Sequence, residues 1–387
     1  MSDLVVRRIG RLTTWAQPRL ADAAVVVRDG RVRWVGPDRD LPAGLGDVAE
    51  LDAGGAAVLP GFVDSHTHLV WAGSRRDDVV GRLAGASYQP GGITSTVTAT
   101  RAAGTDQLGA LAQARVDTAV ASGTTTMEVK SGYGLTPDDE LRLLDVAGSL
   151  TGPTITTTYL GAHVVPPDRD RADYVREVVA QLPAAVAHGA RWCDVFCDEG
   201  AFSVAEARTI LTAARAAGLG LRMHAEQLSA SGAAELAAEL GCASADHLDY
   251  VTPTSAAAMA AAGVVAALVP VTSLYTRNGR WGHGQVLRDA GCTLAIATDC
   301  NPGTAWCEAM PYAVQLACLG MGLEVDEALR AATLGGAAAL CRDDVGQLGL
   351  GARGDLVVLA SDHEADLVAH LGAPAVTATV VGGLIPS

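Results

Sequence analysis

The sequence contains few aromatic residues and almost no lysine. Phe, Trp and Tyr make up 4% of its 387 residues, and Lys130 is the only lysine. The hydrophobic residues, 49% of the chain, are therefore mostly Ala, Val and Leu, and they are accompanied by 44 glycines. This composition indicates a large globular fold with a core of small aliphatic side chains and many short turns between strands and helices.

Signals for export or membrane insertion are also missing. No uninterrupted apolar run reaches 18 residues, and the start of the chain has neither the basic segment nor the apolar core of a signal peptide. We therefore expect no membrane association and a cytoplasmic location. The eight cysteines have no regular spacing and form no Cys-x-x-Cys motif. That pattern favours reduced, mostly packed thiols over a disulfide framework.

Clusters of basic residues are absent as well. The chain has 28 Lys and Arg residues against 43 Asp and Glu residues, which gives a formal net charge of −15. Phosphate backbones are bound by clustered cations, and an acidic surface opposes them. The charge balance therefore argues against a nucleic-acid partner.

A repeated pattern runs through the middle of the chain. Short apolar runs that end in polar residues alternate with Ala-rich segments of helical periodicity. The runs cover residues 57–66, 124–131, 154–163, 192–198, 220–226, 244–248, 264–273 and 292–299. Helical segments between them include residues 106–122, 138–150, 170–188, 204–217, 230–240 and 254–262. Eight such units predict a parallel (β/α)8 TIM barrel over residues 57–342, with its chemistry at the carboxyl ends of the strands.

The two ends of the chain have a different character. Residues 23–36 form two apolar runs around Asp29-Gly30, which is a hairpin signal. Residues 354–359 and 375–381 also have strand character but are too short to fold alone. We therefore expect a small β-sandwich domain built from residues 1–56 and 343–387.

Histidines and one aspartate follow several of the predicted barrel strands. His66 and His68 have the i, i+2 spacing that turns both rings to one side of a strand, and His224 and Asp299 end the fifth and eighth strands. Three imidazoles and a carboxylate are a suitable ligand set for one divalent metal ion that activates a water molecule. His247, which ends the sixth strand, is a candidate to hydrogen-bond or deprotonate that water. Asp299 is the other candidate for proton transfer.

An arginine follows the histidine pair at residue 75. A guanidinium beside a metal pocket is well shaped to hold a carboxylate through two hydrogen bonds, although a solvated surface arginine is an equally good interpretation of this residue alone. Tyr133, within Ser131-Gly132-Tyr133-Gly134, and His163, after Gly161-Ala162, end the second and third strands. These positions predict a mouth that binds a small molecule carrying a carboxylate.

The constellation resembles the amidohydrolase superfamily, whose members carry His-x-His on the first barrel strand. One branch of that superfamily bridges two metals with a carboxylated lysine on the fourth strand, but residues 192–198 contain no lysine. A mononuclear site is therefore expected. Several deaminases of the superfamily have His-x-x-Glu on the fifth strand, where this chain has His224-Ala225-Glu226-Gln227. A neutral Gln227 cannot move a proton, so the adjacent Glu226 is kept as a candidate catalytic acid.

Within the superfamily, the sequence is most similar to the imidazolonepropionase family of histidine degradation. The resemblance extends along nearly the whole chain and is carried most specifically by Glu128–Leu135 and Asp299–Thr304. It implies a homodimeric hydrolase that converts 4-imidazolone-5-propanoate to N-formimidoyl-L-glutamate, with zinc or iron bound by His66, His68, His224 and Asp299. The implied substrate contacts are Arg75, Tyr133, His163, Gln227, Asn301, Gly303 and Thr304, with His163 able to polarise the ring carbonyl.

Two other interpretations remain at this point. One is a related aminohydrolase that releases ammonia from a formimidoyl, imidazole or pyrimidine substrate. The other is a metal-free scaffold with the same barrel. Two segments also depart from the pattern of the family: residues 86–92 are shorter than expected, and residues 269–275 have a different composition.

Overall fold

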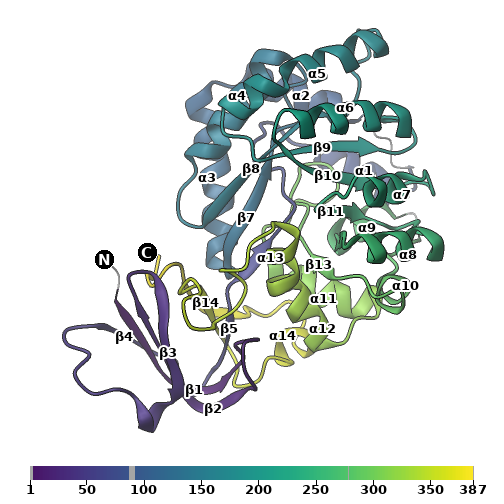
Figure 1. Ribbon diagram of the computed structural model, residues 1–387. Coiled ribbons are helices and arrows are strands. Elements are labelled where there is room, and N and C mark those ends of the chain that lie inside the picture. The colour runs from purple at the N-terminus through teal and green to yellow at the C-terminus, as the bar shows by residue number, and fades with distance from the viewer. Residues whose placement is uncertain (1–2, 87–91, 278, 387) are drawn as a thin grey trace.

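The computed structural model describes residues 3–86, 92–277 and 279–386 (Figure 1). Its larger sheet has eight parallel strands arranged in chain order, from β6 to β13. Their bounds are Phe62–Asp64 (β6), Thr124–Lys130 (β7), Thr154–Ala162 (β8), Trp192–Cys197 (β9), Gly220–Ala225 (β10), Ser244–His247 (β11), Val265–Leu268 (β12) and Leu294–Ile296 (β13). The order of the strands confirms the predicted barrel.

The barrel closes where the residues after its first and last strands meet. The amide of His68 donates to the carbonyl of Cys300 at 2.9 Å, and the amide of Asp299 donates to the carbonyl of His66 at 3.0 Å. This short parallel pairing joins β6 to β13, as backbone hydrogen bonds join the other neighbouring strands of the barrel. It also fixes the backbones of His66, His68 and Asp299 relative to one another.

Helices cover the outside of the barrel. Six of them match the expected helical segments: α3 (Thr105–Ala121), α4 (Pro137–Ser149), α5 (Arg171–Ala187), α6 (Val204–Ala216), α7 (Ala233–Glu239) and α8 (Pro253–Ala262). The capping residues Thr136, Asp170 and Ser203 accept backbone N–H bonds at the starts of α4, α5 and α6, as polar caps do. The remaining helices are α1 (Arg76–Leu83), α2 (Ile93–Ala102), α9 (Pro270–Thr276), α10 (Gly284–Asp289), α11 (Met310–Met321), α12 (Val325–Arg330), α13 (Gly336–Ala339) and α14 (Asp366–Ala369), with short 3-10 and π turns at Asp38–Asp40 and Ala331–Gly335. Among the described helices, none combines the length and apolar character needed to cross a membrane.

A second, seven-stranded sheet joins both ends of the chain, at the lower left of Figure 1. Its strands are β1 (Leu4–Leu12), β2 (Leu20–Arg28), β3 (Arg31–Pro37), β4 (Ala49–Asp52), β5 (Ala57–Pro60), β14 (Leu356–Leu359) and β15 (Val376–Val380). The hairpin turn between β2 and β3 has Asp29 and Gly30 at φ of 51° and 72°, as the Asp-Gly signal predicts. Val6, Val25, Val58 and Val358, from both ends of the chain, are buried in one core. The expected small β domain of mixed origin is confirmed, while its residue boundaries stay a prediction.

Three of the expected strands differ from those in the structure. The run 57–66 is divided, because Ala57–Pro60 pairs with β1 and β14 in the smaller sheet and only Phe62–Asp64 joins the barrel. The run 264–273 ends as a strand at Leu268, because Pro270 begins helix α9. The run 292–299 is a strand only over Leu294–Ile296. Most of the segment 86–92, which departs from the family pattern, lies outside the described part of the chain, namely residues 87–91.

Candidate metal centre

Four ligand atoms converge at the carboxyl ends of the barrel strands. The Nε2 atom of His68 lies 3.3 Å from Nε2 of His66 and 3.4 Å from Nε2 of His224. The Oδ1 atom of Asp299 lies 3.4 Å from Nε2 of His66 and 3.3 Å from Nε2 of His68. All four side chains are buried, with 3% exposure or less. The predicted metal ligands therefore come together, although they are up to 233 residues apart in the sequence.

These separations fit a metal ion. Zinc bonds to imidazole nitrogen and carboxylate oxygen are about 2.0–2.1 Å long, so tetrahedral ligand atoms lie about 3.3–3.4 Å apart. Without a cation, three imidazole nitrogens and a carboxylate oxygen at these distances would include unfavourable lone-pair contacts. This donor set supports a bound divalent metal.

The far side of two ligand rings contacts buried carboxylates. Nδ1 of His66 donates to Oδ2 of Asp246 at 2.6 Å, and Nδ1 of His224 lies 3.0 Å from Oδ2 of Asp194. Both carboxylates are fully buried. A hydrogen on Nδ1 leaves the Nε2 lone pair free for a metal, so these contacts set the tautomer that ligation requires. The sequence analysis did not identify Asp194 or Asp246 as site residues, although both lie within predicted strands and Asp246 directly precedes His247.

Burial and neighbouring charges shift the pKa values of the ligand side chains in different directions. Burial and the Lys130 ammonium lower the pKa of His66, but Asp246 and Asp299 outweigh them and raise it to about 9. Burial lowers the pKa of His68 to about 4. Burial alone would raise the pKa of Asp299, yet the neighbouring His66 and His68 bring it well below its usual range. Asp299 is therefore an ionised carboxylate.

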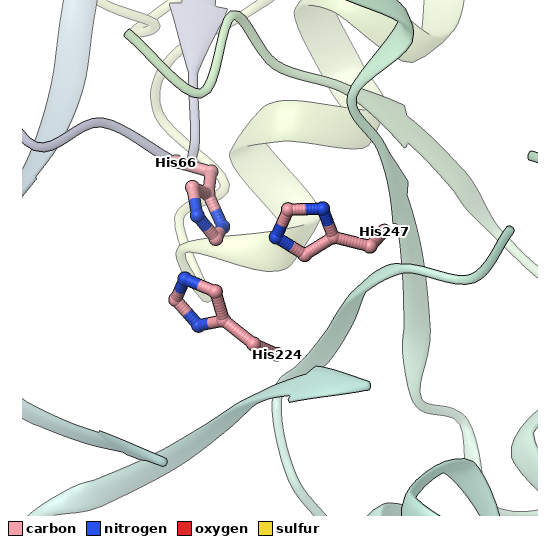
Figure 2. Close-up of side chains that lie close together, drawn as sticks. All are labelled: His66, His224 and His247. Atoms are coloured by element: carbon pink, nitrogen blue, oxygen red, sulfur yellow. The ribbon is translucent and has the colours of Figure 1, made fainter. Parts of the chain in front are cut away.

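His247 faces the space between the metal ligands, and Asp299 has a second carboxylate oxygen beside the ligand atom. Figure 2 shows the rings of His66, His224 and His247 turned toward one another. Within the described part of the chain, neither ring nitrogen of His247 has a hydrogen-bond partner, and burial holds its pKa well below the usual value. Oδ2 of Asp299 accepts a hydrogen bond from the Thr272 hydroxyl at 2.5 Å. Both residues have left-handed backbones, with φ of 82° at His247 and 51° at Asp299, and such strain is typical of functional positions.

A cavity that opens to solvent lies above the ligands. Its lining includes six of the seven predicted substrate contacts, namely Arg75, Tyr133, His163, Gln227, Asn301 and Thr304. Ile93, Val164 and Phe196 add apolar surface that the sequence analysis did not anticipate. Gly303 does not line the cavity.

Gly303 instead leaves room for Arg75. A β-carbon at residue 303 would collide with the Arg75 guanidinium, and so would a β-carbon at Gly92. The guanidinium also donates from Nε to Oδ2 of Asp78 at 2.7 Å, while Arg82 donates to the carbonyl of Gly303. Arg75 is 7% exposed. Its cation is therefore fixed at the edge of the cavity and does not extend into solvent.

The loop that carries Tyr133 is organised by Glu140. This buried carboxyl accepts backbone N–H bonds from Gly132, Gly134 and Leu135 at 2.7–2.8 Å. The carbonyl of Gly132 in turn accepts a hydrogen bond from Nδ1 of His163 at 2.9 Å. Because burial brings the pKa of His163 well below its usual value, the ring is neutral and presents a lone pair at Nε2. His163 is thus suited to accept from a substrate N–H, whereas the sequence analysis expected it to polarise a carbonyl.

Glu226 lies apart from this constellation. The residue adopts φ of 53°, and its carboxyl contacts Glu235 and the backbone amides of Gly232 and Ala234 at the start of α7. Burial and the neighbouring Glu235 raise the pKa of Glu226 to about 8. Gln227, and not Glu226, is the residue that lines the cavity after β10. The structure therefore does not bring Glu226 together with the other predicted site residues.

Comparison with known proteins agrees with this geometry. Residues 57–385 match the model of the amidohydrolase family. An imidazolonepropionase of Streptomyces avermitilis is 48% identical over 92% of this chain and 85% of its own length. That of Salinispora arenicola is 46% identical over 99% of both chains. The chain belongs to the imidazolonepropionase family. The expected class of enzyme, an amidohydrolase, is confirmed, and a metal-free scaffold is disfavoured.

Solved structures of other proteins show the same fold. A 5-methylcytosine deaminase of Klebsiella pneumoniae has a TM-score of 0.76 at 16% identity and matches 98% of this chain and 97% of its own. An N-isopropylammelide isopropylaminohydrolase of Burkholderia multivorans has a TM-score of 0.73 at 22% identity, over 100% and 98% of the two chains. At such identities the likeness establishes the barrel and its accessory sheet, while the chemistry must be argued from the site.

Proposed function

We propose that this imidazolonepropionase-family chain hydrolyses the ring C–N bond of 4-imidazolone-5-propanoate to give N-formimidoyl-L-glutamate. One water adds across the bond, with its oxygen bonding to the carbonyl carbon and a proton passing to the ring nitrogen, and no ammonia is released. The observation that carries the proposal is the fixed guanidinium of Arg75 beside a cavity that holds a metal-ligand set. A cation there suits the propanoate carboxylate.

The metal is proposed to be zinc or iron(II), since three imidazoles and a carboxylate suit both. When bound, it supplies a water of lowered pKa as the nucleophile at neutral pH. His66, His68, His224 and Asp299 would hold it. We also propose, from the family resemblance, a homodimer located in the cytoplasm.

Residues of the chain would orient the substrate and move the proton. Arg75 binds the carboxylate at the edge of the cavity, and the Nε2 lone pair of His163 accepts from a ring N–H. Asp299, which is ionised, would take the proton from the attacking water and deliver it to the leaving ring nitrogen. His247, whose nitrogens are without partners in the described structure, hydrogen-bonds the oxygen that attacks or the oxygen on which charge develops.

The remaining polar residues of the cavity would fix the position of the ring. Tyr133, Gln227, Asn301 and Thr304 line the cavity, and Nδ2 of Asn301 donates to Oγ1 of Thr304 at 2.9 Å. Gln227 has no proton to exchange at neutral pH. Its presence where deaminases carry a glutamate supports ring opening over release of ammonia.

The decisive experiment incubates the metal-loaded protein with imidazolonepropanoate and follows the ultraviolet absorbance of the ring, with ammonia measured in the same sample. Loss of absorbance with formation of N-formimidoyl-L-glutamate and no ammonia is the expected result. Stoichiometric ammonia would instead indicate an aminohydrolase. No reaction with this substrate would overturn the proposal.

A further inference from the structure

A buried ion network lies beneath the metal ligands and involves the only lysine of the chain. Nζ of Lys130 is 2.7 Å from Oε1 of Glu128, 2.8 Å from Oδ2 of Asp194 and 4.0 Å from Oδ2 of Asp246. Nη2 of Arg222 is 3.6 Å from the same oxygen of Asp246. All five side chains have no exposed surface. We call these five residues the basal network.

The basal network contacts the metal ligands through two carboxylates. Asp194 and Asp246, which Lys130 joins, are the same residues that face Nδ1 of His224 and Nδ1 of His66. The Oδ1 atom of Asp194 also accepts the backbone N–H of His224 at 3.1 Å. One ammonium therefore stands behind two of the three ligand histidines.

The charges of the basal network complement a divalent metal. Its two cations and three carboxylates, together with Asp299, carry a formal charge of minus two, and all lie at 3% exposure or less. A divalent cation among the ligand atoms makes the assembly neutral. Removal of the Lys130 cation would leave three buried carboxylates with Arg222 as the one remaining cation of the basal network, and Asp194 would lose its ion-pair partner. Breaking a buried ion pair in this way is strongly unfavourable.

We infer that Lys130 is a positioning residue for the metal centre, whose ammonium holds Asp194 and Asp246 in the places from which they orient His224 and His66. The inference rests on the metal site of the proposed function but not on the identity of the substrate. A lysine suits this place because an ammonium is a compact charge with three donors, which matches carboxylates arriving from three different strands.

The test compares metal retention in Lys130→Met and in the wild-type protein. Both are loaded with Zn²⁺ or Co²⁺ and mixed with a chromophoric chelator, and the visible spectrum of the cobalt form reports the ligand geometry. Displacement of Asp194 and Asp246, the outer partners of His224 and His66, is expected to make the variant hold metal about 10–100-fold more weakly and to alter its cobalt spectrum. Wild-type retention and spectrum in a folded Lys130→Met protein would overturn the inference.

The matched control is Arg115→Met. Arg115 is also a buried cation, 7% exposed, but it lies over the Trp71 ring and donates to the carbonyls of Leu69 and Trp71, and it contacts none of the basal network. This variant should lose stability without losing metal. Equal metal loss in both variants would show a general effect of burying fewer cations and would also overturn the inference.

A second variant keeps the test decisive if Lys130→Met does not fold. Asp194→Asn preserves shape but removes the charge that links Lys130 to His224, and it should weaken retention and alter the cobalt spectrum in the same direction. An unchanged Asp194→Asn centre would count against the inference. Normal metal retention and normal substrate turnover in these variants would reject only the role of Lys130. Weakened metal retention in the variants, together with a wild-type protein that does not open the imidazolone ring, would reject only the proposed substrate.

Discussion

The guanidinium of Arg75 occupies the space that a β-carbon on Gly303 would need. The absence of a side chain at residue 303 therefore helps to position the Arg75 guanidinium at the cavity. Gly303 follows Asn301, whose side-chain oxygen accepts the backbone N–H groups of Gly303 and Thr304 at 2.8 Å, so this close approach is held firmly.

Gly303→Ala should displace Arg75 and weaken substrate binding. Hydrogen bonds to charged groups contribute about 1.5–3 kcal/mol, so KM for imidazolonepropanoate should rise about tenfold or more, with a smaller effect on kcat. Steady-state kinetics check this. Gly109→Ala, in helix α3 with open space around its α-carbon, is the control and should leave KM unchanged. An unchanged KM for Gly303→Ala would mean that the guanidinium does not bind the carboxylate from its present position.

Arg75→Ala should raise KM by about 10–100-fold, because it removes the carboxylate contact altogether. Combining it with Gly303→Ala tests whether the two residues act together. If Gly303 acts through Arg75, the double variant should have the KM of Arg75→Ala alone, which a double-mutant cycle measures as coupling. Simple addition of the two effects would assign Gly303 a separate contact with the substrate.

Asp299→Ala should abolish turnover, since it removes both a metal ligand and the proposed proton carrier. We expect kcat to fall by at least about 10²–10⁴-fold, the usual contribution of general acid–base catalysis. Metal content must be measured in the same preparation. Thr272→Val, which removes only the hydrogen bond to Oδ2 of Asp299, should keep its metal and lose much less activity. Substantial turnover by Asp299→Ala would show that the site is assigned incorrectly.

Glu226 should make the fold less stable as the pH rises. Its pKa lies at about 8 in the folded protein, above the ordinary value of 4.5, so the folded state holds a proton that the unfolded state releases. The contribution of Glu226 to the free energy of unfolding should therefore fall between pH 4.5 and about 8 and then level off. Glu226→Gln keeps the shape without the charge, and its Tm should exceed that of the wild type by about 2–4 °C near pH 8.5 but not near pH 4.

Thermal unfolding across this pH range checks the Glu226 prediction, and identical pH profiles would contradict it. Turnover of the same variant tests the catalytic role that the sequence suggested for Glu226. A folded, metal-loaded Glu226→Gln protein without activity would restore that role, despite the position of the carboxyl outside the cavity.

Much of the site was predictable because barrel strands bring their carboxyl ends together whatever their distance in the sequence. The i, i+2 pair His66 and His68 and the strand-end residues His224 and Asp299 needed only the alternation of strands and helices to be placed near one another. Side-chain direction after a strand was harder to predict. Glu226 and Gln227 are adjacent, with a left-handed backbone at Glu226, yet the Glu226 carboxyl contacts the start of α7 while Gln227 lines the cavity.

Other features depend on contacts that no local pattern encodes. Lys130 was noticed in the sequence for its rarity and for its absence from the fourth strand, but its partners Asp194 and Asp246 lie on strands that reach it only in the closed barrel. The division of the run 57–66 depends on β14, almost 300 residues later, which pairs with β5. In both cases the deciding partner is distant in sequence, so apolar periodicity alone could not reveal it.

The pairing of β5 with β14 also bears on the order of events during synthesis of the chain. Strand β5 ends at Pro60, six residues before His66, and its neighbour β14 ends at Leu359. A ribosome therefore makes the first metal-binding histidines early, but the strand that flanks the segment leading to them emerges almost last. Domains usually fold in the order in which they are made. Here β5, which precedes the first barrel strand, can complete its pairing only after β14 has been synthesised. Nascent chains stalled before residue 356 should therefore have an unpaired β5 edge.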